Sequence, residues 1–425
     1  MSEETKRPVE ETKPAETVLQ DSQTENAAAD ELLYPVLVID SDLESSVKVA
    51  GLNQKARWEK TFEQLDFSGS FDVKFFQEDL FSSEVGKLDK AALLVDGSFV
   101  IEPLLVETLL ERGTDIKANE VVCLKTSKGC APVLLVGAEA AATISADWQA
   151  GQSEVMQSLI DFASDNTSVN MRTLVFDKAF FWNRPTTKKE SKESEWGLLQ
   201  RLQWRPGGLV AQLLNRPVSI RMSRYMAATP ITPNQTTILA FLIGLFGIYF
   251  LFVGQYWGAI LGMLLIQLNS IVDGVDGELA HLRHQRSEFG GFLDSVCDEL
   301  LNSLIYIATG FFLTNNGYWV GYVYLGLFAG IASLMYALTH WHCKIKHGLG
   351  LYWWWDAYKP RKRIQSEMTP YFYLRKLFCK DSIILLFLFA AVFSFLHYLV
   401  WIAAAAGLVT VVLLFIHIFI KRARW

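Results

Sequence analysis

The chain has 425 residues, of which 51% are hydrophobic and 20% are charged, and its formal net charge is -6 at pH 7. This length allows two or three domains. Polar residues crowd before about residue 230 and long apolar runs follow it, which excludes a protein that is water-soluble along its whole length. The five cysteines lack the paired spacing of a zinc site, so we interpret them as reduced and structural.

Residues 1–31 are rich in Glu, Thr, Pro, Ala and Gln and nearly lack large apolar side chains. Such a segment cannot bury enough surface to offset its ordering entropy, so we expect a disordered acidic tail. No apolar segment opens the chain, and we expect no cleaved signal peptide. Much of the excess of acidic residues lies in this tail, while the membrane-flanking segments are basic, so the net charge does not exclude anionic partners.

Residues 32–180 have the pattern of a cytoplasmic α/β domain. Buried strands are predicted at 32–40, 91–101, 120–126 and 131–137, and helices at 55–65 and 102–113. This alternation predicts a mainly parallel sheet covered by helices.

Residues 181–200 are expected to form a charged linker. Residues 201–235 follow, in which arginines alternate with apolar residues: Arg201, Arg205, Arg216, Arg221 and Arg224. This pattern predicts one or two juxtamembrane amphipathic helices with their arginines toward lipid phosphate. A plain surface anchor would have the same pattern.

Six apolar segments predict an all-α transmembrane domain over 236–425, because most approach the roughly 20 residues that span a bilayer. They lie at about 236–254, 256–276, 291–314, 318–341, 381–396 and 398–420. The first, third and fifth links lack Lys and Arg, whereas the alternate links and the C-terminal tail carry many. The positive-inside rule then predicts that both termini lie in the cytoplasm. We therefore expect a multi-domain integral membrane protein.

Four aspartates lie around the link between the second and third apolar segments: Asp273, Asp276, Asp294 and Asp298. On helices, their spacing places each successive pair on one face. Two such faces turned toward each other would form a carboxylate cage that suits hard divalent cations, and a pair of ions there suits phosphoryl chemistry. Alternatively, the acids are solvated or paired with Arg283 and Arg286.

This stretch resembles the signature of the CDP-alcohol phosphotransferases, D-x-x-D-G-x-x-A-R-x8-G-x-x-x-D-x-x-x-D. The matching positions are Asp273, Asp276, Gly277, Ala280, Gly290, Asp294 and Asp298. His281 stands where the pattern has Arg, which puts one contact to the nucleotide or phosphate in doubt. Members also have a T-P-N-x-x-T opening of the first span, represented here by Thr232, Pro233, Asn234 and Thr237. The resemblance covers about residues 200–425 well.

The resemblance implies an enzyme of phospholipid or polyol-phosphate biosynthesis. Members transfer a substituted phosphate from a CDP-linked donor to an acceptor hydroxyl and release CMP. The four aspartates would bind a pair of Mg²⁺ or Mn²⁺ ions, and Asp298 would also deprotonate the acceptor. The implied partners are the CDP-linked donor, a lipid or inositol-phosphate-type acceptor and membrane lipids. A homodimer is kept open, and no nucleic-acid partner is expected.

Further site candidates come from the motif and from the basic residues around it. Candidates for nucleotide binding are Gly277, Ala280, Gly290, Asn234 and Thr237, and candidates for acceptor or phosphate binding are Arg216, Arg221 and Arg283. Small residues at 277 and 280 would let a nucleotide approach the second span closely. Gly290 has a second interpretation, because a small residue there would also let the second and third spans pack tightly.

The N-terminal domain resembles the sugar-nucleotidyltransferase domains that a bacterial and archaeal branch of this family carries, which implies a location in the cytoplasmic membrane. In an active domain, a Gly-rich basic loop would follow the first strand and hold the nucleotide phosphates. Here that strand continues into IDSDLESSVK, without the glycines and the Arg. Asp96 lies where a metal-binding acid would be, although an Asp-Gly pair after a strand is also a common turn. We therefore expect a degenerate domain without nucleotidyl transfer.

Two other classes of function are kept as alternatives. A carrier would also place acids inside the membrane, but it should show internal repeats, and the chain has a single acidic cluster. A catalytically weakened membrane scaffold would explain His281 and the missing Gly-rich loop, while the complete set of four aspartates favours an enzyme.

Overall fold

The computed structural model describes residues 34–40, 48–65, 71–77, 81–147, 155–176, 180–203, 208–347 and 379–422. The chain divides into two compact units, Met1–Ser194 and Glu195–Trp425. The boundary falls within helix α7 (Lys188–Leu202), in the stretch expected to be a charged linker. The predicted disordered tail, the loop after the first strand at 41–47 and the basic link at 358–365 lie outside the described residues.

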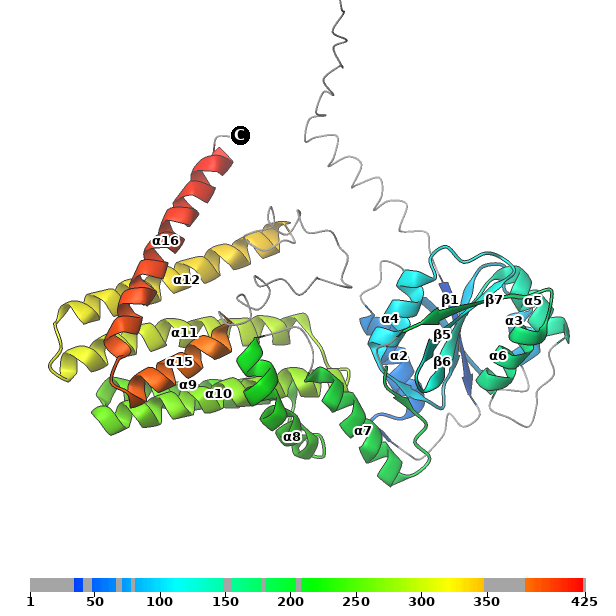
Figure 1. Ribbon diagram of the computed structural model, residues 1–425, viewed down its shortest axis with the longest axis horizontal. Coiled ribbons are helices and arrows are strands. Elements are labelled where there is room, and N and C mark those ends of the chain that lie inside the picture. Colours follow the sequence, from blue (N-terminus) through cyan, green and yellow to red (C-terminus); the bar gives the residue numbers. More distant parts are fainter. Residues whose placement is uncertain are drawn as a thin grey trace, which may run out of the picture. The chain divides into compact units, whose positions relative to one another are not determined.

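The first unit is built on a six-stranded sheet with the order β2-β1-β3-β6-β5-β7 (Figure 1). Its strands are β1 (Tyr34–Asp40), β2 (Phe71–Gln77), β3 (Ala92–Asp96), β5 (Glu120–Thr126), β6 (Gly129–Val136) and β7 (Asn170–Val175). The pairs β1–β2, β1–β3 and β5–β7 are parallel, which confirms a mainly parallel sheet. Strand β6 is antiparallel to β5, because a tight turn with Gly129 at φ +110° reverses the chain between them. It is also antiparallel to β3.

Helices cover both faces of this sheet, because successive side chains of a strand point to opposite faces. On one face, Leu37 and Ile39 of β1 pack against helices α3 (Phe81–Val85), α5 (Ala138–Asp147) and α6 (Val155–Asp165). On the other face, Val36 and Val38 pack against α2 (Gln54–Gln64) and α4 (Pro103–Arg112). All five residues of β3 are buried, as expected for a central strand covered on both sides.

The predicted strands and helices of this unit are confirmed, but the prediction was incomplete. Strands β2 and β7 were not identified, and the apolar run 91–101 is divided into β3 and the short strand β4 (Val100–Ile101) by a turn. Strand β4 pairs with β8 (Trp182–Asn183) in a separate small sheet. In the turn, the Asp96 carboxylate accepts hydrogen bonds from the Ser98 backbone N–H at 2.9 Å and from its hydroxyl at 2.5 Å. These contacts match the turn interpretation of Asp96.

The second unit is a helical bundle preceded by a surface segment. Its long helices are α9 (Pro233–Val253), α10 (Tyr256–Leu282), α11 (Glu288–Asn315), α12 (Gly321–His347), α15 (Lys380–Val392) and α16 (Leu396–Arg422). Within the described residues, five of these are long and apolar enough to cross a membrane. The sixth, α15, matches the fifth predicted segment but has only 13 described helical residues.

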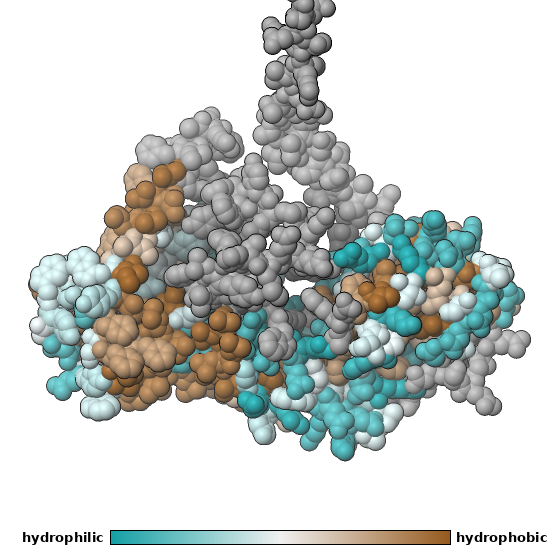
Figure 2. All heavy atoms as spheres, viewed as in Figure 1, coloured by the Kyte–Doolittle hydropathy of each residue, from teal (hydrophilic) through white to brown (hydrophobic). Residues whose placement is uncertain are grey.

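Close backbone contacts and an apolar exterior characterise this bundle. A Cβ atom on Gly247 of α9 would lie 2.7 Å from the Gly262 carbonyl oxygen of α10, so the small residues allow the two helices to touch. Figure 2 shows hydrophobic residues over the outside of the helices. Large apolar side chains such as Leu242, Phe246 and Ile402 are exposed there, and a lipid bilayer would cover such a surface.

The surface segment comprises a π-helical turn η2 (Ala211–Asn215) that continues into α8 (Arg216–Met226). Helix α8 is attached to α10 by the buried side chain of Glu278, whose carboxylate accepts hydrogen bonds from the hydroxyls of Ser219 and Ser223, each at 2.5 Å. After α8 the chain enters α9 through a capping box formed by Thr232 and Gln235, with Pro233 in the first turn. The expected juxtamembrane helix is therefore followed at once by the first span.

Candidate active site

Three of the four aspartates converge at one end of the bundle. Asp273 comes from α10, and Asp294 and Asp298 come from adjacent turns of α11. Each offers a carboxylate oxygen that lies within 4.8 Å of the corresponding oxygens of the other two, and all three residues are half-buried. Carboxylate oxygens grouped in this way match the ligand preference of Mg²⁺ and similar hard cations. The donor set therefore fits a divalent ion.

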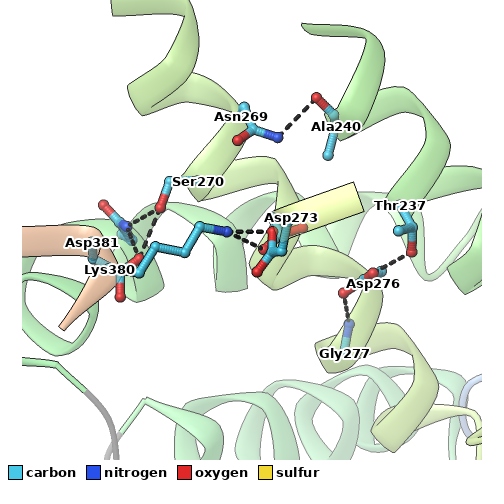
Figure 3. A network of polar contacts seen from close by, with 11 residues as sticks. Thr237, Ala240, Asn269, Ser270, Asp273, Asp276, Gly277, Lys380 and Asp381 are labelled. Carbon is cyan, nitrogen blue, oxygen red and sulfur yellow. Dashed lines mark hydrogen bonds and ion pairs between the residues drawn. The ribbon is translucent and has the colours of Figure 1, made fainter. Parts of the chain in front are cut away.

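The fourth aspartate, Asp276, is directed toward α9 (Figure 3). Its carboxylate accepts hydrogen bonds from the hydroxyl of Thr237 and from the backbone N–H of Gly277. The i,i+3 spacing puts Asp276 on the same side of α10 as Asp273, but a helix face is broad enough for the two side chains to contact different neighbours. Thr237, a candidate for nucleotide binding, thus holds one of the candidate metal ligands.

A lysine that sequence reasoning missed enters the acidic cluster from α15. The Lys380 ammonium donates to Asp298. It also lies 3.8 Å from an Asp273 carboxylate oxygen, and Figure 3 shows these two side chains facing each other. A partly buried ammonium needs such counter-charges, because its desolvation is otherwise costly. The available signal was a charged pair, Lys380 and Asp381, directly at the start of an apolar segment.

A hydrogen-bond network fixes the start of α15 beside this lysine. The side-chain amide of Asn215 donates to Asp381 at 2.9 Å and to the Ser270 hydroxyl at 3.0 Å. Ser270 in turn donates to the same Asp381 oxygen at 2.8 Å, and Gln267 donates to the Asn215 oxygen at 2.8 Å. These contacts join the surface segment, α10 and α15, so they hold Lys380 in place.

The small residues of the motif differ in how much space surrounds them. A Cβ on Gly277 would meet no heavy atom of the described residues within 4 Å, so this side of α10 has open space. A Cβ on Gly290 would lie 3.0 Å from the Asn234 side-chain oxygen of α9. The close neighbour of Gly290 is therefore the first span, not the second span that the packing interpretation proposed. Ala280 is partly exposed one turn after Gly277.

The arginine candidates make mainly backbone contacts. Arg283 is 8% exposed and donates to four carbonyl oxygens of the connection between α8 and α9, those of Met226, Ala227, Thr229 and Ile231. Its contacts therefore support a structural role for Arg283. His281, in the position of the family's Arg, contacts Arg286.

Arg216 and Arg221 differ in their surroundings. Arg221 is exposed and donates to the Pro217 carbonyl oxygen of its own helix at 2.9 Å. Arg216 is partly buried and donates to the Gln203 carbonyl oxygen at 3.0 Å. Burial lowers the pKa of the Arg216 guanidinium, while the nearby charges of Glu278 and Asp381 raise it. Arg216 thus lies closer to the polar interior of the bundle than Arg221 does.

Comparison with known proteins agrees with this geometry. Residues 230–413 match the family model of CDP-alcohol phosphatidyltransferase. This region belongs to that family. The family is membrane-bound, and with five candidate membrane spans among the described helices the chain is an integral membrane protein.

Curated relatives match part of the chain. A bifunctional IPC transferase and DIPP synthase of Aquifex aeolicus is 32% identical over 153 residues, which is 36% of this chain and 35% of the relative. A protein with the same name in Thermococcus kodakarensis is 30% identical over 38% of this chain and 36% of the relative. Archaetidylinositol phosphate synthase of Pyrococcus horikoshii is 38% identical over 20% of this chain and 44% of the relative. Each match thus spans less than half of the relative's length.

Proposed function

We propose that the chain is a divalent-metal-dependent CDP-alcohol phosphotransferase, which transfers a substituted phosphate from a CDP-linked donor to an acceptor hydroxyl and releases CMP. The convergence of Asp273, Asp294 and Asp298 in the family's domain is the observation that carries the proposal. Asp276, oriented by Thr237, completes the set of candidate ligands. Mg²⁺ or Mn²⁺ bound there would neutralise the charge of a pyrophosphate.

In this mechanism the residues of α9, α10 and α11 have separate tasks. The open space beside Gly277 admits the nucleotide, with Asn234, Thr237 and Ala280 as further candidates for its contacts. Asp298 takes the proton of the acceptor hydroxyl as the new oxygen–phosphorus bond forms. The bond between that phosphorus and the CMP oxygen breaks, and CMP leaves with the electron pair.

Lys380 supplies positive charge at the same place. Its ammonium contacts Asp298 and lies near Asp273, so it reduces the mutual repulsion of the acids. An ammonium in this position also attracts a substrate phosphate, since charge-assisted hydrogen bonds to phosphate are strong. We assign Lys380 to binding of the transferred phosphate.

We extend this proposal to the donor, the acceptor and the orientation of the chain in the membrane. The relatives' names support donors and acceptors of polyol-phosphate and phospholipid synthesis. The basic links of the sequence favour a cytoplasmic site and cytoplasmic termini. A homodimer stays a prediction. For the first unit we propose no nucleotidyl transfer, and robust formation of a CDP-linked product from CTP by the full chain would contradict this.

The test is CMP release by the purified full-length chain in detergent with a panel of CDP-linked donors and hydroxyl acceptors. We expect release that depends on both substrates, stops with a chelator and returns with Mg²⁺ or Mn²⁺. Glu288→Ala, which removes an exposed acid from the first turn of α11, serves as a control for the loss of a carboxylate. Metal-independent release, or no release with any pair, would contradict the proposal.

A further inference from the structure

The chain turns back toward the last turn of α10 directly after this helix ends at Leu282. His284 has φ +51°, in the left-handed region, and the backbone N–H of Gln285 donates to the Ala280 carbonyl oxygen at 2.8 Å. A left-handed residue followed by a hydrogen bond back to the final turn is a common way to end a helix. The turn therefore brings Arg286, the next residue, beside the end of α10.

The Arg286 guanidinium contacts the ring of His281 in that last turn. A guanidinium carries N–H donors and no acceptor, so it donates to Nε2 of His281. His281 is partly buried, whereas Arg286 is exposed. The ring of His281 thus determines where on α10 the exposed guanidinium lies.

This place is on the same side of α10 as Gly277. Residues four positions apart share a helix face, and helical side chains lean toward the N-terminal end of their helix. His281 therefore leans toward Gly277, where a Cβ atom would meet no heavy atom of the described residues within 4 Å. Asp276, a candidate metal ligand, directly precedes Gly277. The Arg286 guanidinium thus lies on the side of α10 that we assign to the nucleotide.

The other arginine of this link makes its contacts elsewhere. Arg283 is 8% exposed and donates to four backbone carbonyl oxygens between α8 and α9. The family signature has an arginine at position 281, where this chain has a histidine. Arg286 is therefore the residue of the link that brings a guanidinium to the side chain at position 281.

We propose that Arg286 binds a phosphate of the CDP-linked donor and that His281 is its positioning residue. This inference rests on the proposed function and assigns one of its donor contacts to a residue outside the motif. The planar guanidinium matches two phosphate oxygens at once, and its hydrogen bonds to them are strengthened by charge. The histidine at position 281 thus keeps a guanidinium at this place by holding one that comes from the link.

Donor kinetics of the full-length chain in detergent test this assignment through CMP release. We expect Arg286→Ala to raise the donor KM at least about tenfold, as for a lost hydrogen bond to a charged group, and to leave the acceptor KM unchanged. His281→Ala keeps the guanidinium without its partner, so it should raise the donor KM less. Gln285→Ala removes the neighbouring exposed side chain and keeps the backbone hydrogen bond of the turn, so it should behave like the parent.

A double variant distinguishes phosphate binding from a structural role of Arg286. His281→Arg combined with Arg286→Ala returns a guanidinium to the same face of α10, so most of the increase in donor KM should disappear. If Arg286 only stabilised the turn, an arginine at position 281 would not restore the donor KM.

A second measurement needs no turnover. Binding of radiolabelled CDP in the presence of Mg²⁺, and its displacement by cytidine, are measured by equilibrium dialysis with the parent and with Arg286→Ala. We expect the Kd of CDP to rise at least about tenfold and the Kd of cytidine to stay unchanged, because cytidine has no phosphate. An unchanged Kd of CDP, or an equal rise for both ligands, would overturn the inference.

The two proposals fail in different ways. An unaltered donor KM in Arg286→Ala, or no recovery in the double variant, would overturn the assignment of Arg286 and leave the phosphotransferase function intact. Absence of CMP release from the parent with every pair would contradict the function, and the binding of CDP would still decide whether Arg286 contacts phosphate.

Discussion

Lys380 donates a hydrogen bond to Asp298 although the two residues are 82 positions apart in the chain. The same ammonium lies 3.8 Å from an Asp273 carboxylate oxygen. A positive charge thus occupies the place where the candidate metal ligands meet, and the protein itself balances part of their charge. Metal binding must therefore be coupled to the position of Lys380.

This coupling predicts the behaviour of Lys380→Gln. The substitution removes a cation that competes with the metal, so half-maximal activity should need less Mg²⁺. It also removes a phosphate contact, so turnover should fall by about 100-fold, as for other lost electrostatic contacts. CMP release over a Mg²⁺ titration measures both effects. Lys380→Arg keeps the charge, so its Mg²⁺ requirement and its turnover should lie between those of the parent and of Lys380→Gln. An unchanged Mg²⁺ dependence with full turnover would show that Lys380 has neither role.

Asp298→Asn separates metal binding from proton transfer. The amide keeps the size of the side chain and one oxygen ligand, but it cannot take the acceptor's proton. We expect metal and donor binding to persist in part while turnover falls about 10²–10⁴-fold. Alanine at any of the four aspartates should abolish CMP release, and Glu288→Ala is the control. If Asp298→Asn turns over like the parent, the assignment of the base is wrong.

Arg283→Ala should reduce stability more than it affects donor binding. Its guanidinium donates to four backbone carbonyls between α8 and α9, and a hydrogen bond to a charged group contributes about 1.5–3 kcal/mol. A lower thermal midpoint in detergent with an unchanged donor KM is the expected result. Arg221→Ala, at an exposed position of α8, should leave the midpoint unchanged. A raised donor KM at normal stability would instead indicate that Arg283 binds phosphate.

Asp381→Ala tests the network that positions Lys380. The change leaves the Asn215 amide and the Ser270 hydroxyl without their shared acceptor, at a cost of about 1–3 kcal/mol for each buried group left unsatisfied. We expect lower stability and a Mg²⁺ dependence shifted in the same direction as in Lys380→Gln. Asp381→Asn retains an acceptor oxygen, so its stability and its Mg²⁺ dependence should both lie closer to those of the parent. A stability loss without any change in Mg²⁺ dependence would mean that the network does not position Lys380.

The topology proposal is tested with a reporter fused after Trp425. Since the basic links alternate with uncharged ones, we expect the reporter to register in the cytoplasm. A periplasmic or extracellular signal would contradict it.

The sequence was sufficient to predict the two fold classes, most of the long helices and the convergence of Asp273 with Asp294 and Asp298. Each of these follows from a repeated local pattern, either apolar periodicity or a fixed spacing along a helix. Lys380 could not be found in this way, because its partner lies on another helix and local spacing says nothing about such a distance. Strand β2 was missed although its first five residues, FDVKF, alternate apolar and charged side chains, which is the pattern of a half-buried strand.

The orientation of Asp276 could not be predicted either, because it depends on a neighbouring helix. Helical spacing restricts a side chain to one face, but the neighbour on that face decides its direction, and here the neighbour is Thr237 of α9. Arg283 likewise stands in a segment whose charge suggested phosphate binding, while its partners are backbone carbonyls that a sequence pattern does not display.

The close contact between Gly247 and Gly262 has a consequence for Asp276. Backbone atoms of α9 and α10 already meet there, and a Cβ on Gly262 would lie 2.6 Å from the Gly247 carbonyl oxygen. Moving one helix toward the other would therefore bring main-chain atoms into overlap, so α9 and α10 are already at their closest approach at this level. Thr237 and Asp276 belong to the same two helices, and their hydrogen bond joins them nearer the acidic cluster. The carboxylate is thus oriented before any substrate arrives, which spares the reaction the free energy of arranging it.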